Sequence, residues 1–127
     1  MRIRRTLAAA AATAALAGGL AVTTTAPATA SAAACYSETH RDVSDGSGYT
    51  VFGKNTPLRK AGPYADCPST SIPPNTLFDI DCSTENDLGN LWYYGEAAVE
   101  TSSGYVYHRG WIYEANIDIY FADINPC

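Results

Sequence analysis

Short apolar and aromatic runs alternate with turn-forming residues along the chain after residue 48. The clearest runs, 77–82, 91–99 and 105–113, are separated by clusters of glycine, proline, asparagine and serine. The repeat of three to four residues that marks an amphipathic helix is nearly absent. Short strands broken at this spacing are typical of a β-sandwich or a small barrel, so the pattern predicts an all-β domain.

The most regular strand runs from Thr76 to Cys82, where apolar and polar side chains alternate. A period of two places Phe78 and Ile80 on the core face, and Asp79 and Asp81 in solvent. We interpret the two carboxylates as a solvated face, because nothing nearby would give them the different environments of an acid and a base.

A hairpin is predicted from strands 91–99 and 105–113, joined by the Ser-Ser-Gly turn at 102–104, and residues 117–124 form a last apolar segment. The first of these strands carries Trp92, Tyr93 and Tyr94 in succession. Successive side chains of a strand point to opposite faces, so the three rings cannot all face one core. The sequence therefore predicts an exposed aromatic face.

The first 32 residues have the composition of a secretory signal peptide. A basic start is followed by an apolar run from Leu7 to Val22 and by small-residue cleavage sites that end near Ala32. The run is short for a bilayer span, so we expect no membrane association after cleavage. The pair Arg4-Arg5 suggests twin-arginine export as an alternative to general secretion.

Cleavage after Ala32 would leave 95 residues, divided into a polar N-terminal arm (33–48) and one folded domain with a C-terminal tail (49–127). The three arginines of the signal are then lost, and five basic and 13 acidic residues remain, a formal charge of −8. Nucleic acids and anionic membranes are bound through clustered basic side chains, so neither is an expected partner.

Four cysteines, Cys35, Cys67, Cys82 and Cys127, predict two disulfides in a small exported domain. Cys67 and Cys82 lie symmetrically about the turn at 72–76, so antiparallel flanks would pair them and leave Cys35 with Cys127. The pairing of Cys35 with Cys67 and of Cys82 with Cys127 stays open. Zinc is disfavoured because no two cysteines are closely spaced. A lipid-modified Cys35 would leave an odd cysteine.

Catalytic chemistry has no support in the sequence. His40 and His108 are the two histidines, there is no Gly-x-Ser-x-Gly motif, and four bridged cysteines leave no thiol nucleophile. We expect both histidines to be ordinary surface or cross-strand residues. No enzyme activity, cofactor or metal is predicted.

Four motifs occur in an order that resembles a bacterial Src-homology-3-type domain. They are Leu58-Arg59 with Gly62-Pro63, the strand from Leu77 to Cys82, Trp92-Tyr93-Tyr94, and Gly110-Trp111-Ile112. The resemblance covers residues 49–117 and implies a small Src-homology-3-like barrel of five or six short strands. Small exported members carry cysteines at the positions of Cys67 and Cys82, which supports their pairing.

Two positions depart from this pattern. Asn75 stands where a glycine is usual, although asparagine can still enter left-handed backbone space. Asn116 stands where the resemblance leads us to expect an aromatic residue of the ligand groove.

The resemblance implies a monomeric, non-enzymatic binding module that is extracellular or associated with the cell wall. Its expected partners are peptidoglycan peptides or other extracellular proteins. The predicted ligand-binding residues are the aromatic candidates Tyr64, Tyr93, Trp111 and Tyr113. The alternative is a secreted protease inhibitor or toxin-like protein, with the loop 69–75 as its reactive element.

Overall fold

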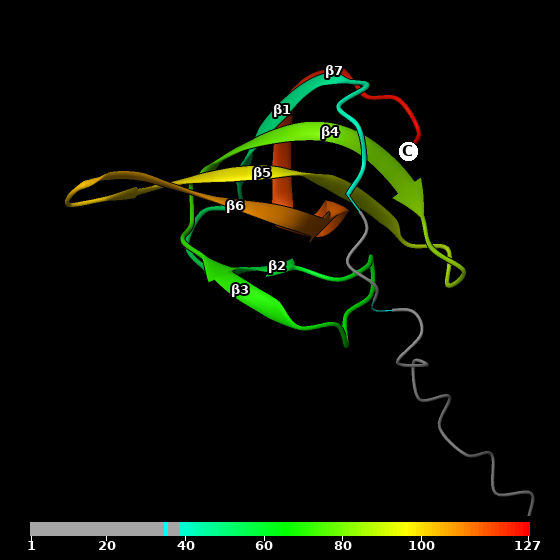
Figure 1. The fold of residues 1–127 in the computed structure, drawn as a ribbon, viewed down its shortest axis with the longest axis horizontal. Helices are drawn as coiled ribbons and strands as arrows, with labels where there is room; N and C mark the ends of the chain where they lie inside the picture. Colours follow the sequence, from blue (N-terminus) through cyan, green and yellow to red (C-terminus); the bar gives the residue numbers. More distant parts are fainter. Residues whose placement is uncertain (1–34, 36–38) are drawn as a thin grey trace, which may run out of the picture.

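Seven β-strands form one antiparallel sheet in the computed structural model, which describes Cys35 and residues 39–127 (Figure 1). The predicted signal peptide lies outside the described residues. The strand order is β3-β2-β6-β5-β4-β1-β7. The strands are β1 (Asp45–Thr50), β2 (Thr56–Arg59), β3 (Ser69–Ile72), β4 (Leu77–Glu85), β5 (Leu91–Thr101), β6 (Gly104–Tyr113) and β7 (Ile117–Asp123), with the 3₁₀ turn η2 (Glu114–Asn116) before β7.

The all-β prediction is confirmed, but the sheet is open and not a closed barrel of five or six strands. Strands β3 and β7 are its two edges. Strand β1 begins at Asp45, inside the segment that was predicted to be an arm, and pairs with both β4 and β7. Among the described residues, no helix has the length and apolar character needed to cross a membrane.

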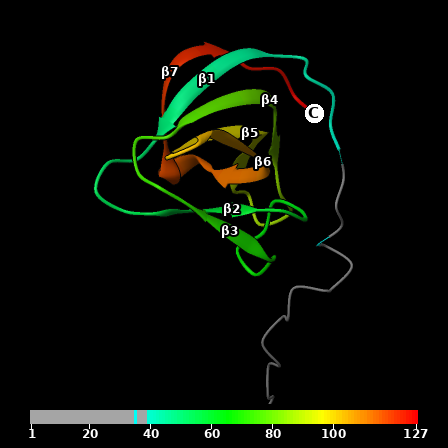
Figure 2. The same ribbon diagram turned by 60° about the vertical axis from the view of Figure 1, so that its left-hand side comes forward.

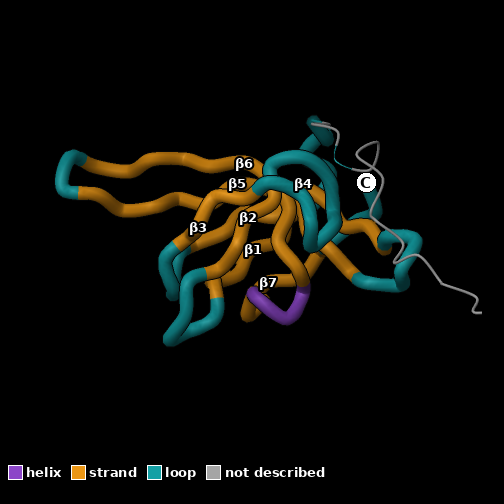
Figure 3. The backbone as a smooth tube through the Cα atoms, turned by 90° about the horizontal axis from the view of Figure 1, so that it is seen from below, coloured by secondary structure: helices purple, strands orange, loops and turns teal. Residues whose placement is uncertain are grey.

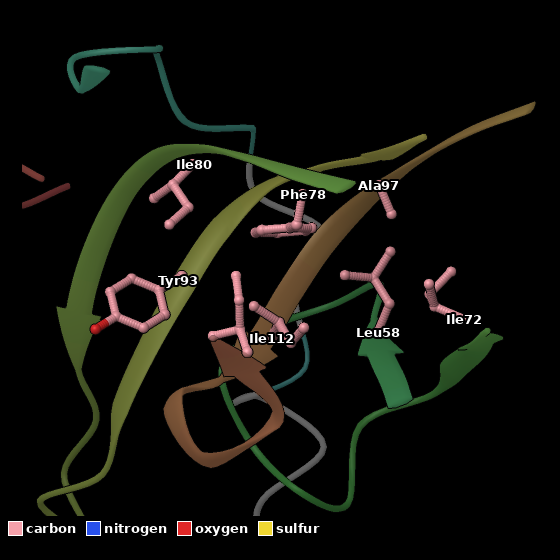
Figure 4. Close-up of a cluster of buried hydrophobic side chains, with 8 residues drawn as sticks. Leu58, Ile72, Phe78, Ile80, Tyr93, Ala97 and Ile112 are labelled. Atoms are coloured by element: carbon pink, nitrogen blue, oxygen red, sulfur yellow. The ribbon is translucent and has the colours of Figure 1, made fainter. Parts of the chain in front are cut away.

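The sheet curls strongly, so that the β2–β3 ribbon faces β4 and β5 across the main core (Figures 1 and 2). Figure 4 shows the apolar side chains meeting between these two parts. As predicted, Phe78 and Ile80 point inward from β4. The other buried members of this cluster are Leu58, Ile72, Tyr93, Ala97, Ile112 and Ile117.

Two glycines allow the strands to cross this closely. Gly95 of β5 lies opposite Gly110 of β6. A Cβ atom at Gly95 would overlap the carbonyl oxygen of Asp79 on β4, and one at Gly110 would overlap that of Arg59 on β2. Bare backbone is therefore required at both positions.

The outer side of the curled sheet carries a second cluster, formed by Cys82, Trp92, Tyr94 and Trp111. The ring of His40, from the segment before β1, contacts Tyr94 and Trp111 edge-on at centroid distances of 5.0 Å. The prediction that one side of the Trp92–Tyr94 run is exposed is therefore wrong. Tyr93 fills the main core, while its two neighbours are buried on the opposite face by this second cluster.

A β-bulge in β4 overturns the prediction for Asp81. The pairing of β4 with β5 shifts register between Ile80 and Cys82, so the strict alternation of side chains ends at Asp81. Asp79 is exposed as predicted, but the Asp81 side chain is only 6% exposed and forms an ion pair with Arg109. Burial raises the pKa of Asp81, although the hydrogen bond and charge of Arg109 oppose this shift.

Arg109→Met is expected to lower the free energy of unfolding by about 2 kcal/mol near neutral pH. It would leave the Asp81 carboxylate buried without its cation, which in a fully buried pair costs about 3–5 kcal/mol. Arg109 is about half exposed, so water screens part of this effect. Urea unfolding of the oxidised protein at about pH 4 and about pH 7 measures it.

The pH dependence has a definite sign. With a raised pKa, the folded protein holds the Asp81 proton more tightly than the unfolded chain does. The contribution of Asp81 to the free energy of unfolding is therefore fully present below its pKa in the unfolded chain, about 4. It is lost as the pH rises through its higher pKa in the folded protein. Without Arg109 that pKa rises further, so the variant should lose more stability between acid and neutral pH. Glu96→Gln is the control, because it removes the second ion pair of Arg109, in which Glu96 Oε2 lies 3.2 Å from Arg109 Nε. It should lower the free energy of unfolding by less than about 1 kcal/mol. Equal losses for Arg109→Met at both pH values would contradict the explanation.

The disulfides connect Cys35 with Cys67 and Cys82 with Cys127, so the favoured pairing was wrong and its alternative is correct. Asn75 does adopt the left-handed conformation, with φ of 56°. The turn that it closes, however, does not join two paired strands. Strand β3 pairs with β2, and β4 pairs with β1 and β5, so Cys67 and Cys82 diverge. Two disulfides are compatible with an extracellular protein.

Candidate functional site

The four predicted ligand-binding residues do not form one surface. Tyr93 lies in the main core and Trp111 in the second cluster, only 8% and 3% exposed. Tyr64, in the loop after β2, is half-buried, and a hydrogen bond to Asp87 raises the pKa of its hydroxyl. Tyr113 is also half-buried and lines a pocket. The prediction thus identified one residue of a candidate site.

That pocket has a volume of about 300 Å³ and lies between β2, the start of β5 and η2. Its aromatic wall consists of Trp92 and Tyr113, which are cross-strand neighbours with ring centroids 5.3 Å apart. Further lining residues are Arg59, Ala65, Asn90 and Asn116. We call it the Trp92 pocket. Its volume is at the lower end of the range for small-ligand sites.

Two residues that line the pocket carry buried N–H donors that lack partners in the described chain. Trp92 Nε1 and Arg59 Nε are buried and have no hydrogen-bond partner among the described residues. Arg59 Nη1 donates to the carbonyl oxygen of Cys67 at 2.9 Å, which fixes the guanidinium beside the pocket. Both donors can take an acceptor oxygen. Neither nitrogen is open to solvent as the side chains lie, so an acceptor reaches it only when a neighbouring side chain moves aside.

A buried asparagine holds the two loops that border the pocket. Asn86 Nδ2 donates to the carbonyl oxygen of Pro63 at 2.8 Å, and Asn86 Oδ1 accepts from the backbone N–H groups of Leu88 and Asn90. These bonds tie the loop before β5 to the loop after β2, and so position Asn90 and Ala65 at the pocket. The Asn-Asp-Leu-Gly-Asn stretch was the local signal of a side-chain-closed turn.

One grouping of metal-ligating atoms exists in the described part of the chain, formed by His40, Cys82 and Cys127. Both sulfur atoms belong to the same disulfide, so they are not thiolates and cannot act as metal ligands in the oxidised protein. Comparison with protein-family models, with curated proteins and with solved structures found no match to this chain.

Proposed function

We propose that this protein is an exported, non-enzymatic binding module of the Src-homology-3-like kind, and that its ligand occupies the Trp92 pocket. The observation that carries the proposal is an aromatic pocket whose lining residues Trp92 and Arg59 each carry a buried N–H donor without a partner in the described chain. A buried donor without an acceptor costs about 1–3 kcal/mol. A ligand that supplies the acceptor recovers part of this free energy, and rigid rings add contact area at low entropic cost.

A peptide meets both requirements, because it offers a carbonyl oxygen at every residue together with apolar side chains. Cell-wall peptides or extended segments of extracellular proteins are therefore the ligands we propose. The motifs behind the Src-homology-3-like assignment support the same site, since Arg59 and Trp92 belong to them and both line the pocket. The two disulfides fit an extracellular location.

The inhibitor alternative depended on a rigid exposed loop at 69–75, braced by a disulfide between Cys67 and Cys82. Residues Ser69–Ile72 instead form edge strand β3, and Cys67 is bound to Cys35. No observation favours this alternative over the binding module.

Soluble stem peptides released from purified peptidoglycan should shift the indole N–H signal of Trp92 in nuclear magnetic resonance spectra of the oxidised protein. The signal of Trp111 should stay unchanged, because this ring, unlike that of Trp92, does not line the pocket. Arg59→Lys keeps the charge but removes the Nε donor, so it should weaken binding about tenfold. Titrations of the wild type and the variant provide the measurement.

The matched control is Arg41→Lys, the same exchange at an exposed position outside the pocket. If the two variants bind alike, the Trp92 pocket is not the site. If neither indole signal moves and immobilised peptidoglycan retains no protein, wall peptides are the wrong ligand class. Both readings require well-dispersed spectra, which show that the variants are folded.

A further inference from the structure

The β5–β6 hairpin is long and extends away from the body of the molecule (Figures 1 and 3). A second hollow, larger than the Trp92 pocket, lies on the outer side of the sheet beside this hairpin. Its volume is about 530 Å³, and strands β1, β4, β5 and β6 and the β3–β4 loop contribute to its walls. We call it the hairpin groove. It shares no lining residue with the Trp92 pocket.

Tyrosines dominate the exposed walls of the hairpin groove. Tyr105 and Tyr107 on β6 are each 60% exposed, and Tyr49 on β1 is 41% exposed. Strand register connects them, because Tyr107 lies opposite Ala98, Ala98 opposite Leu77, and Leu77 opposite Tyr49. The result is one apolar and aromatic row across four strands. Rigid strands hold these rings in place, so little entropy is lost when they contact a ligand.

The groove is also acidic. Asp79 and Glu100 line it, and no lysine or arginine occurs among the described residues of its wall. A neighbouring hollow of about 260 Å³ shares Asp79 and adds Asp42, Asp45 and Asp81.

The strands around the groove extend this negative charge. Strands β1 and β4–β7 together carry eight acidic side chains and a single basic one, Arg109, which is already paired with Asp81 and Glu96. The charge of Asp79 and Glu100 is therefore left without a cation from the described part of the protein.

We propose that the hairpin groove binds a lysine- or arginine-bearing segment of a partner polypeptide. Exposed tyrosine faces attract ammonium and guanidinium groups, and carboxylates beside them provide the opposite charge. Charge complementarity favours a cationic segment over a neutral or anionic one. This site is independent of the Trp92 pocket, so either proposal can fail while the other stands.

An acetylated tetralysine amide, titrated into the oxidised protein at low salt, tests the proposal. Amide signals of Ala98 and Tyr107 should shift, and binding should weaken as salt is raised. Asp79→Asn combined with Glu100→Gln should weaken binding about tenfold, since two ion pairs are lost. Tyr107→Ser should weaken it about threefold through loss of the cation–π contact.

The matched control combines Asp66→Asn with Glu114→Gln, which removes the same charge from exposed positions outside the groove. It should change the affinity less than about twofold. Equal weakening by the two double variants would show diffuse attraction to net charge and would overturn the proposal. Absence of tetralysine binding would overturn it too. If oligomers of N-acetylglucosamine shift the groove signals and tetralysine does not, the groove recognises carbohydrate instead.

Discussion

Gly95→Ala is expected to lower the free energy of unfolding by about 3 kcal/mol or more. The added Cβ would overlap the carbonyl group of Asp79, which belongs to the paired strand β4. Backbone atoms cannot rotate away as the end of a side chain can, so the strands must separate and weaken their ladder of hydrogen bonds. Urea unfolding, followed by the change in tryptophan fluorescence, measures the effect.

Gly53→Ala is the matched control for Gly95→Ala. A Cβ atom at Gly53 meets nothing within 4 Å, but its φ of 84° is unfavourable for alanine. This substitution should therefore cost only about 1 kcal/mol. Gly110→Ala should resemble Gly95→Ala, because its Cβ meets the backbone of Arg59. A loss at Gly95 no greater than that at Gly53 would show that the sheet adapts at this crossing.

Local patterns were sufficient to predict β4, β5, β6 and the segment of β7, but not β1, which begins inside the predicted arm, or β3, which lies in the predicted loop 69–75. Alternation in the sequence placed Phe78 and Ile80 in the core, and the Ser-Ser-Gly turn predicted the hairpin of β5 and β6. Both predictions depend on residues that are close in sequence. The rule that side chains alternate along a strand needs no knowledge of the rest of the fold.

Features that depend on strand partners could not be predicted in this way. The pairing of β3 with β2 decides which cysteines meet, and no local signal near Cys67 specifies it. The bulge at Asp81 adds one residue to β4 and so changes which face this carboxylate occupies. Trp92 and Tyr94 are buried because they pack with Cys82 and Trp111 in the second cluster, and the ring of His40 contacts Tyr94; these contacts join residues that are distant in sequence.

In the candidate site, too, the sequence predicted what depends on residue type but not what depends on tertiary packing. Tyr113 was identified from composition, because aromatic side chains suit recognition surfaces, and it lines the Trp92 pocket. Arg59 and Trp92 were noted as parts of motifs but were not predicted to bind a ligand. Their donors are significant only because the fold buries them without acceptors, which is a property of tertiary packing and not of residue type.

Replacement of both Cys82 and Cys127 with alanine is expected to lower the free energy of unfolding by about 4 kcal/mol, the value that loop-closure entropy gives for a separation of 45 residues. The bond also joins the C-terminal residue to β4, beside the bridge between Ser83 and Pro126. There, Ser83 donates to the carbonyl oxygen of Asn125, and Cys127 donates to that of Ser83. Denaturant unfolding of the oxidised variant and wild type provides the measurement.

The variant that lacks Cys35 and Cys67 separates the entropy of loop closure from the role of the C-terminal segment. Cys35 and Cys67 are 32 residues apart, so loop-closure entropy predicts a loss of stability within about 0.5 kcal/mol of that for the Cys82–Cys127 bond. However, Cys82 belongs to the second aromatic cluster, and the Cys127 sulfur lies within 4.8 Å of a ring nitrogen of His40, whose ring contacts Tyr94 and Trp111. We therefore expect release of Cys127 to loosen this cover and to allow water to reach these rings. Loss of the Cys82–Cys127 bond should therefore be the more damaging of the two and should shift Trp111 fluorescence to longer wavelength. Equal losses without such a shift would mean that this disulfide acts only through the unfolded chain.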